Sequence, residues 1–336
     1  MPSESCCQIA NHVLTRSLDK KWRSLEQPDR RDRASGGVAL PSFTSHNIRL
    51  DDGTYTKPDA GYAMDVHPWF LGAKRLLDAT FPGDKSELRI ADLGCLEGGY
   101  TVEFARLGFQ ALGLDVREAN IEACRYVKSR VNLPNLHFAR DDVWNIADHG
   151  VFDAMFCCGL FYHLDKPRAF LDLLSRVTKR VLILQTHFSE ARDAPSWVHP
   201  RRLRRALSRI IPLKNTATTT HKLSFLTQHE GIPGRWFSEF RNERAFRDRA
   251  NRHWASWNNR SSFWLQREYL LQSIRDAGFD LVMEQFDPLG SNIAFEMTRG
   301  SYRTSGRSTF VGIKTSYVAD LNSAGGPESV AGVRQS

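Results

Sequence analysis

Apolar residues in the middle of the chain follow two patterns that alternate along the sequence. Short, nearly continuous apolar runs alternate with segments whose apolar positions lie three or four residues apart, the spacing of a helix with one buried face. The short runs predict strands at residues 88–93, 111–115, 136–139, 152–158 and 181–184. The longer segments predict helices at residues 65–80, 99–107, 118–131 and 167–177. This alternation predicts an α/β fold with a doubly wound, mostly parallel sheet.

The alternation stops after residue 187 and resumes near residue 263. Residues 188–262 are basic, aromatic and rich in turns, so we expect a helical or irregular insertion after the fifth strand. A helix is expected over residues 263–277, with Gly278 ending it. Residues 279–286 and 291–298 predict two last strands, antiparallel because their connection is short, which brings the sheet to seven strands.

The two ends of the chain differ in composition from this middle part. Residues 1–60 are polar and rich in turns, and we expect an N-terminal extension that is partly disordered at its start. Residues 300–336 are rich in Ser, Gly and Thr, which predicts a flexible tail. The sheet would then divide into a core at residues 61–187 and a C-terminal part at residues 263–299.

Composition restricts the class of protein. No apolar run among the 336 residues reaches the ~20 needed to cross a bilayer, and residues 1–21 have no apolar signal-peptide core. The six cysteines include no Cys-x-x-Cys pair, which favours a reducing, cytoplasmic setting. The net charge is +8, and from Arg201 to Arg267 there are fifteen Lys or Arg against four acidic residues. This basic stretch suits either a solvated helical face or a site for an acidic substrate or nucleic acid.

A candidate ligand site lies at the end of the first predicted strand. Asp92 closes the strand, Gly94 follows it, and a helix is expected to begin after Gly98. Glycine permits a sharp bend and close approach to a ligand, and ligands of open parallel sheets bind at the carboxyl ends of strands. Asp115, at the end of the second strand, is suited to the hydroxyls of a ribose. Asp142, after the third strand, is suited to the amino group of adenine.

The segment Asp92-Leu93-Gly94-x-x-x-Gly98, together with Asp115 and Asp142, resembles the first three signatures of class I methyltransferases that use S-adenosylmethionine (SAM). The resemblance covers about residues 85–300 without the insertion. It implies a Rossmann-like sheet with SAM as cofactor. It also implies that Gly94, Cys95 and Gly98 approach the methionine part of SAM, that Asp115 binds its ribose, and that Asp142 and Val143 hold its adenine. The family's usual middle glycine is Leu96 here, which puts the shape of the loop in question.

Two histidines are candidates for the reaction centre. The fourth strand leads into Gly159 and then Leu160-Phe161-Tyr162-His163-Leu164, and in the expected fold this loop lies beside the SAM methyl group. The run is similar to the Tyr-His element of the tRNA wobble-uridine carboxymethyltransferase group and of many small-molecule methyltransferases. The fifth strand brings His187 to the same edge. Histidine suits proton removal near neutral pH. Each histidine could instead be structural. Tyr162 is a candidate either for a wall of the pocket or for a catalyst.

The sequence contains no motif typical of a nicotinamide-binding site, a metal site or a serine-nucleophile turn. The glycine loop lacks the Gly-x-Gly of a nicotinamide-binding dehydrogenase. No cluster of Cys and His has the spacing of metal ligands, so no metal is expected, and no Gly-x-Ser-x-Gly nucleophile turn occurs.

The insertion is expected to determine the substrate, because insertions at this position commonly form a lid. Trp254 and Trp257 could line a pocket or anchor a small subdomain, and Arg235 or Arg260 could hold an anionic metabolite. Residues 47–56 could also fold across the cofactor mouth. Three functions remain open: a methyltransferase acting on oxygen or nitrogen of a small molecule, an RNA-modifying transferase, and a non-catalytic SAM-binding protein. We favour the first because the insertion contains no recognisable RNA-binding module, and the oligomeric state stays open.

Overall fold

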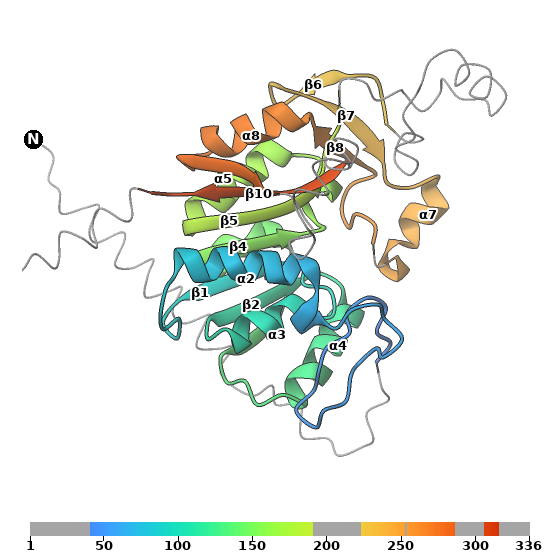
Figure 1. The fold of residues 1–336 in the computed structure, drawn as a ribbon. Helices are drawn as coiled ribbons and strands as arrows, with labels where there is room; N and C mark the ends of the chain where they lie inside the picture. Colours follow the sequence, from blue (N-terminus) through green and yellow to red (C-terminus); the bar gives the residue numbers. More distant parts are fainter. Residues whose placement is uncertain (1–40, 191–222, 253, 286–305, 316–336) are drawn as a thin grey trace, which may run out of the picture.

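The seven-stranded sheet expected from the sequence forms the centre of the molecule (Figure 1). The computed structural model describes residues 41–190, 223–252, 254–285 and 306–315. The strand order is β3-β2-β1-β4-β5-β10-β9, and only β10 is antiparallel to its neighbours. The strands are β1 (Arg89–Leu93), β2 (Gln110–Asp115), β3 (Leu136–Arg140), β4 (Phe152–Cys158), β5 (Thr178–His187), β9 (Leu281–Gln285) and β10 (Arg307–Ile313). The predicted fold class is therefore confirmed.

Helices cover both faces of the sheet, which explains why the central strands are apolar along their whole length. Ile90 of β1 packs with one face's cluster, whereas its neighbour Ala91 packs with the other face's cluster. On the first face lie α2 (Pro68–Thr80), α3 (Gly99–Arg106) and α4 (Glu118–Ser129). On the second lie η3 (Val143–His149), α5 (Pro167–Val177) and α8 (Arg267–Asp276). Two one-turn helices, η2 (Met64–Val66) and η4 (Phe161–His163), lie at the cofactor edge.

The last strand corrects the sequence analysis. Residues 300–336 were predicted as a flexible tail, but Arg307–Ile313 is strand β10, inserted between β5 and β9. Phe310 and Val311 are fully buried, and this short apolar centre drives the strand into the sheet. Its polar Ser- and Gly-rich surroundings concealed it in the sequence. The strand expected at residues 291–298 lies outside the described residues.

The described part of the insertion contains a second, three-stranded antiparallel sheet (Figure 1). Its strands are β6 (Thr227–His229), β7 (Ile232–Ser238) and β8 (Ser261–Leu265). Two short helices, α7 (Glu243–Arg247) and η6 (Arg249–Asn251), lie between β7 and β8 in the chain. The helix predicted over residues 263–277 is wrong for residues 263–265, which belong to β8. A short apolar run such as Phe263-Trp264-Leu265 suits a buried strand as well as a helix, and only pairing with β7 decides between them.

Residues 41–50 form a strap that is fixed to the glycine loop by one carboxylate. Glu97 accepts hydrogen bonds from the backbone N–H groups of Ser45 (3.1 Å) and His46 (2.7 Å) and from both the N–H and the hydroxyl of Thr44. Ile48 of the strap is completely buried in the core cluster of the first face. This described part of the predicted extension is therefore ordered against the core. Among the described residues, no helix is long and apolar enough to pass through a membrane.

Candidate active site

The loop after β1 has the backbone bends that the sequence analysis expected. Gly94 and Gly98 have φ angles of 70° and 81°, in the left-handed region that glycine adopts without strain. A Cβ at Gly98 would lie only 2.6 Å from the ring of Phe138. Leu96, at the family's middle glycine, adopts a left-handed φ of 52°, so the leucine keeps the glycine-like shape at some steric cost.

Asp115 offsets part of that cost and faces the cavity. Its carboxylate accepts the N–H of Leu96 (3.1 Å) and the N–H of Arg117 (2.8 Å), which joins the ends of β1 and β2. Burial raises the pKa of Asp115 above its ordinary value, while these hydrogen bonds and the charge of Arg117 act in the opposite direction. The side chain is therefore held rigidly in the position where a ribose is expected.

Three of the predicted cofactor residues lie behind the loop and do not line the cavity. The Asp92 carboxylate accepts the hydroxyl of Thr101 (2.7 Å), and burial raises the pKa of Asp92 to about 7. The Cys95 thiol is buried 4.0 Å from the thiol of Cys124, and burial raises the pKa of Cys95. Gly98 is the N-cap residue of helix α3. These residues shape the loop from within the core.

Asp142 and Val143 line the adjoining end of the cavity, as expected for the adenine position. One oxygen of Asp142 accepts the N–H of Trp144 (3.1 Å) and so caps η3. The other oxygen accepts the amide of Asn258 (2.6 Å), which belongs to the insertion. A residue 116 positions further along the chain thus closes over this end.

A single cavity of about 430 Å³ joins these groups to the predicted reaction centre. Its walls come from the strap, the ends of β1 to β4, the insertion and β10. The lining residues used below are Ser45, His46, Trp69, Gly94, Asp115, Asp142, Val143, Gly159, Tyr162, His163, Trp254, Trp257, Asn258 and Arg307. Of the strap, Ser45 and His46 line the cavity, whereas none of residues 47–56 does. Trp254 and Trp257 have the pocket-lining position that the sequence left open.

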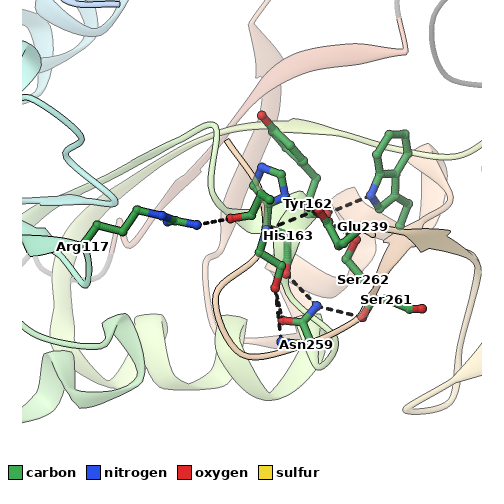
Figure 2. A network of polar contacts seen from close by, with 10 residues as sticks. Arg117, Tyr162, His163, Glu239, Asn259, Ser261 and Ser262 are labelled. Carbon is green, nitrogen blue, oxygen red and sulfur yellow. Dashed lines mark hydrogen bonds and ion pairs between the residues drawn. The ribbon is translucent and has the colours of Figure 1, made fainter. Parts of the chain in front are cut away.

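His163 is held by a buried carboxylate from the insertion (Figure 2). Its Nδ1 lies 2.9 Å from Oε1 of Glu239, whose side chain is 2% exposed. Glu239 also accepts the hydroxyl of Ser262 (2.7 Å) and the N–H of Ser256 (3.3 Å). A carboxylate can only accept, so Nδ1 carries the hydrogen and the lone pair remains on Nε2. The amide of Asn259 additionally fixes the backbone carbonyl of His163 (2.9 Å).

His187 and Tyr162 have different positions from His163. His187 is absent from the cavity lining, stacks on Trp264 with ring centroids 5.0 Å apart, and donates Nδ1–H to the carbonyl of Gly306 (3.0 Å). Burial, assisted by the positive charge of Arg307, lowers the pKa of His187 to about 4. These contacts favour the structural alternative for His187. Tyr162 lines the cavity, and burial raises the pKa of its phenol, which favours a role as a wall.

The arginines expected to hold an anionic substrate do not reach the cavity. Arg235 is buried and donates to the carbonyl of Ser224 (2.9 Å), and Arg260 pairs with Glu243 on the surface (2.9 Å). Arg307, which the sequence analysis placed in the tail, lines the cavity instead. Within the described part of the chain, no group of His, Cys, Asp and Glu is arranged to hold a metal ion.

Glu239 and Asn258 were missed because their partners are distant in sequence. Glu239 is one of only four acidic residues in the basic stretch, and that rarity was the one available signal. Arg117 shows the same long-range closure, because it donates to the carbonyl of Ala255 and lies 5.3 Å from the ring of Trp257. Figure 2 shows Arg117 reaching toward this part of the network.

Known proteins with similar sequences or folds include methyltransferases. A family model described as a methyltransferase domain matches residues 90–180. The N-terminal domain of EvdMO1, in a crystal structure with SAH bound, superposes with a TM-score of 0.55 at 23% identity, over 86% of this chain and 98% of that one. Residues 90–180 therefore match a methyltransferase domain, and the sheet has the fold of class I methyltransferases.

Two further relatives extend the comparison. A second structure of the same EvdMO1 domain, in the presence of SAH and D-fucose, matches this methyltransferase domain with a TM-score of 0.53 at 22% identity, over 86% and 98% of the two chains. The mitochondrial ubiquinone biosynthesis O-methyltransferase of Dictyostelium discoideum is 31% identical over 103 residues. That match spans 27% of this chain and 32% of the relative, so it covers about a third of the curated protein.

Proposed function

We propose that this protein transfers a methyl group from SAM to an oxygen atom of a small molecule bound in the cavity, with nitrogen as the alternative acceptor. The observation that carries the proposal is the cavity itself. It joins Gly94, Asp115 and Asp142 on one side to His163, backed by buried Glu239, on the other. Its volume of about 430 Å³ lies in the range of pockets that hold small ligands and cofactors.

The residues of the first side fit SAM in size and chemistry. Asp115 presents a fixed carboxylate that accepts hydrogen bonds from ribose hydroxyls, while Gly94 keeps the backbone close and free of a side chain. Asp142 accepts the adenine amino group, and Val143 packs against the ring. Asp92, Cys95 and Gly98 contribute by fixing the loop, and Gly159 leaves space beside the reacting methyl. When bound, SAM supplies a methyl group activated by its sulfonium.

His163 would act as the general base. Nε2 of His163 would accept the proton of the acceptor hydroxyl, while SAM would supply the methyl group to that oxygen and leave as SAH. The imidazolium that results lies against the Glu239 carboxylate, which stabilises the positive charge and keeps the ring in one tautomer. Tyr162 and the two tryptophans then position the acceptor, a term that contributes at most about 7–11 kcal/mol in well-oriented reactions.

Oxygen is favoured over nitrogen as acceptor for a chemical reason. A hydroxyl is a poor nucleophile until its proton is removed, whereas a neutral amine can attack first and lose a proton afterwards. A histidine backed by a buried carboxylate is therefore most useful for a hydroxyl. The matched ubiquinone-pathway relative is named as an O-methyltransferase, and EvdMO1 has been crystallised in the presence of a sugar. Both names agree with a small hydroxylated acceptor.

The test has two stages. Calorimetric titration of the purified protein with S-adenosylhomocysteine (SAH) should detect binding, and absence of binding would refute the proposal. Labelled-methyl transfer from SAM into fractions of a whole-cell extract should then give a small-molecule product that survives ribonuclease. Label that is released by ribonuclease would support the RNA alternative. Binding of SAH without transfer to any fraction would support the non-catalytic alternative.

A further inference from the structure

Arg307 places a positive charge in the wall of the cavity, between Trp69 and Tyr162. It is the first residue of β10 and pairs with His187 at the end of β5, which places its backbone at the carboxyl edge of the parallel strands. Ligands of this class of sheet bind along that edge. The side chain lines the same cavity as His163 and Tyr162.

Neighbouring groups fix the direction of the Arg307 side chain. Its Nε donates to Oε1 of Gln185 (2.8 Å), and Gln185 is itself 3% exposed. The guanidinium carbon lies 4.5 Å from the ring centre of Trp69 and 5.4 Å from that of Tyr162. A Cβ built on Gly159 would lie 3.4 Å from Nη2, so the terminal nitrogens lie beside the loop that follows β4. A guanidinium binds a carboxylate through paired N–H groups, so one that lines a cavity is suited to a ligand with this group.

The charges around the cavity are distributed unequally. At the adenosine end the carboxylates of Asp115 and Asp142 lie with the cation Arg117, whereas Arg307 is a cation beside Tyr162, the neighbour of His163. The positive charge of Arg307 also acts on the neighbouring His187, whose pKa it helps to lower. A half-buried cation between aromatic rings attracts an anion that enters the same space more strongly than a fully exposed cation does.

We propose that Arg307 binds a carboxylate group inside the cavity and thereby orients the molecule that carries it. The inference rests on the proposed function. The carboxylate comes either from the methionine part of the cofactor or from an acidic acceptor substrate, and these two sources are chemically alike at the guanidinium. In either case the residue is a binding and positioning group, and His163 remains the base.

The experiment compares the wild-type protein with Arg307→Met and Arg307→Lys by calorimetric titration. The first pair of probes is SAH and 5′-methylthioadenosine, which keeps the adenosine and the sulfur but has no amino acid. If Arg307 binds the cofactor carboxylate, Arg307→Met should weaken SAH binding about 10- to 100-fold and leave 5′-methylthioadenosine within about 2-fold. Arg307→Lys should recover part of the loss, because it keeps the charge without the paired N–H geometry.

The second pair of probes is benzoate and the uncharged benzamide, each titrated into protein saturated with SAH. If the acceptor supplies the carboxylate, benzoate should bind the wild type at least about 10-fold more tightly than Arg307→Met, with benzamide unaffected by the substitution. Lys314→Met is the matched control, because Lys314 follows the same strand and contacts the carbonyls of Ser175 and Thr178 at the opposite edge.

The outcomes separate this inference from the proposed function. If SAH, 5′-methylthioadenosine and benzoate all bind the Arg307 variants as they bind the wild type, the inference is overturned while the proposed function stands. Equal weakening of SAH and 5′-methylthioadenosine also overturns it, because the residue would then support the fold alone. If the wild type binds neither nucleoside, the proposed function itself fails.

Discussion

The cofactor side of the cavity takes Gly94, Asp115 and Asp142 from the ends of three neighbouring parallel strands, all within about fifty residues of sequence. The acceptor side takes His163 from the core, Glu239 from the insertion and Arg307 from the last strand. His163 and Glu239 are 76 residues apart in the sequence. Strand ends of a parallel sheet meet at one edge without further help. The acceptor side instead requires that the insertion and β10 be in place, so the two sides should respond differently to substitution.

The largest expected effect is on the acceptor side. His163→Ala should lower turnover by about 10²–10⁴-fold because the general base is lost, while SAH affinity stays unchanged. Turnover is measured with the acceptor fraction found by the labelled-methyl assay, and affinity by calorimetry. His187→Asn is the matched control and should retain turnover within about 10-fold. Equal losses in the two variants would remove the distinction between the two histidines.

The next effect belongs to the cofactor side. Asp115→Ala removes an acceptor for ribose and also frees the N–H groups of Leu96 and Arg117, so SAH affinity should fall by about 100-fold or more. Calorimetric titration measures this loss. Asp115→Asn keeps the shape and should show a smaller decrease. If Asp115→Ala binds SAH like the wild type, the cofactor side has been assigned to the wrong residues.

The pH dependence of stability should distinguish the two sides. In the folded protein the pKa of Asp92 is about 7, above its ordinary value near 3.8, because the carboxyl is buried. The folded state therefore holds a proton that the unfolded state has lost, and this group's contribution to stability falls as pH rises from about 4 to about 7, by up to about 1 kcal/mol per pH unit. Asp92→Asn should flatten this decline in urea unfolding measured across that range.

His187 on the other side has the opposite sign. Its pKa is about 4 when folded and 6.5 ordinarily, so the unfolded state binds the extra proton and stability rises as pH increases between those values. His187→Asn should reduce this rise in the same urea measurements. A variant that leaves the pH profile of unfolding unchanged would show that the side chain is accessible to solvent.

The smallest effect concerns the contact that joins the two sides. Asn258→Ala removes the hydrogen bond to Asp142, which is exposed at the cavity rim, and should speed SAH dissociation by about 2- to 10-fold. Stopped-flow displacement of SAH measures this rate. Asn251→Ala, which removes a surface hydrogen bond to Asp248 elsewhere in the insertion, is the control and should leave dissociation unchanged. Unchanged dissociation in Asn258→Ala as well would mean that the insertion does not close over the cofactor.

The sequence alone determined strands β1 to β5 and the loop of the proposed cofactor side. Hydrophobic runs located β1 to β5 to within a few residues, because strands covered on both faces must be apolar along their length. The spacing of Gly94, Gly98 and Asp115 then specified the loop, since the backbone bends depend on the residues at those positions themselves.

Tertiary structure alone decided the acceptor side. The strand β10 depends on the buried Phe310 and Val311 finding a gap between β5 and β9, and no local pattern reports that gap. The pairing of Glu239 with His163 likewise follows from contacts between distant segments, as does the presence of Arg307, and not Arg235 or Arg260, in the cavity wall. Local sequence constrains backbone shape, whereas long-range packing determines which charged side chain lies next to which.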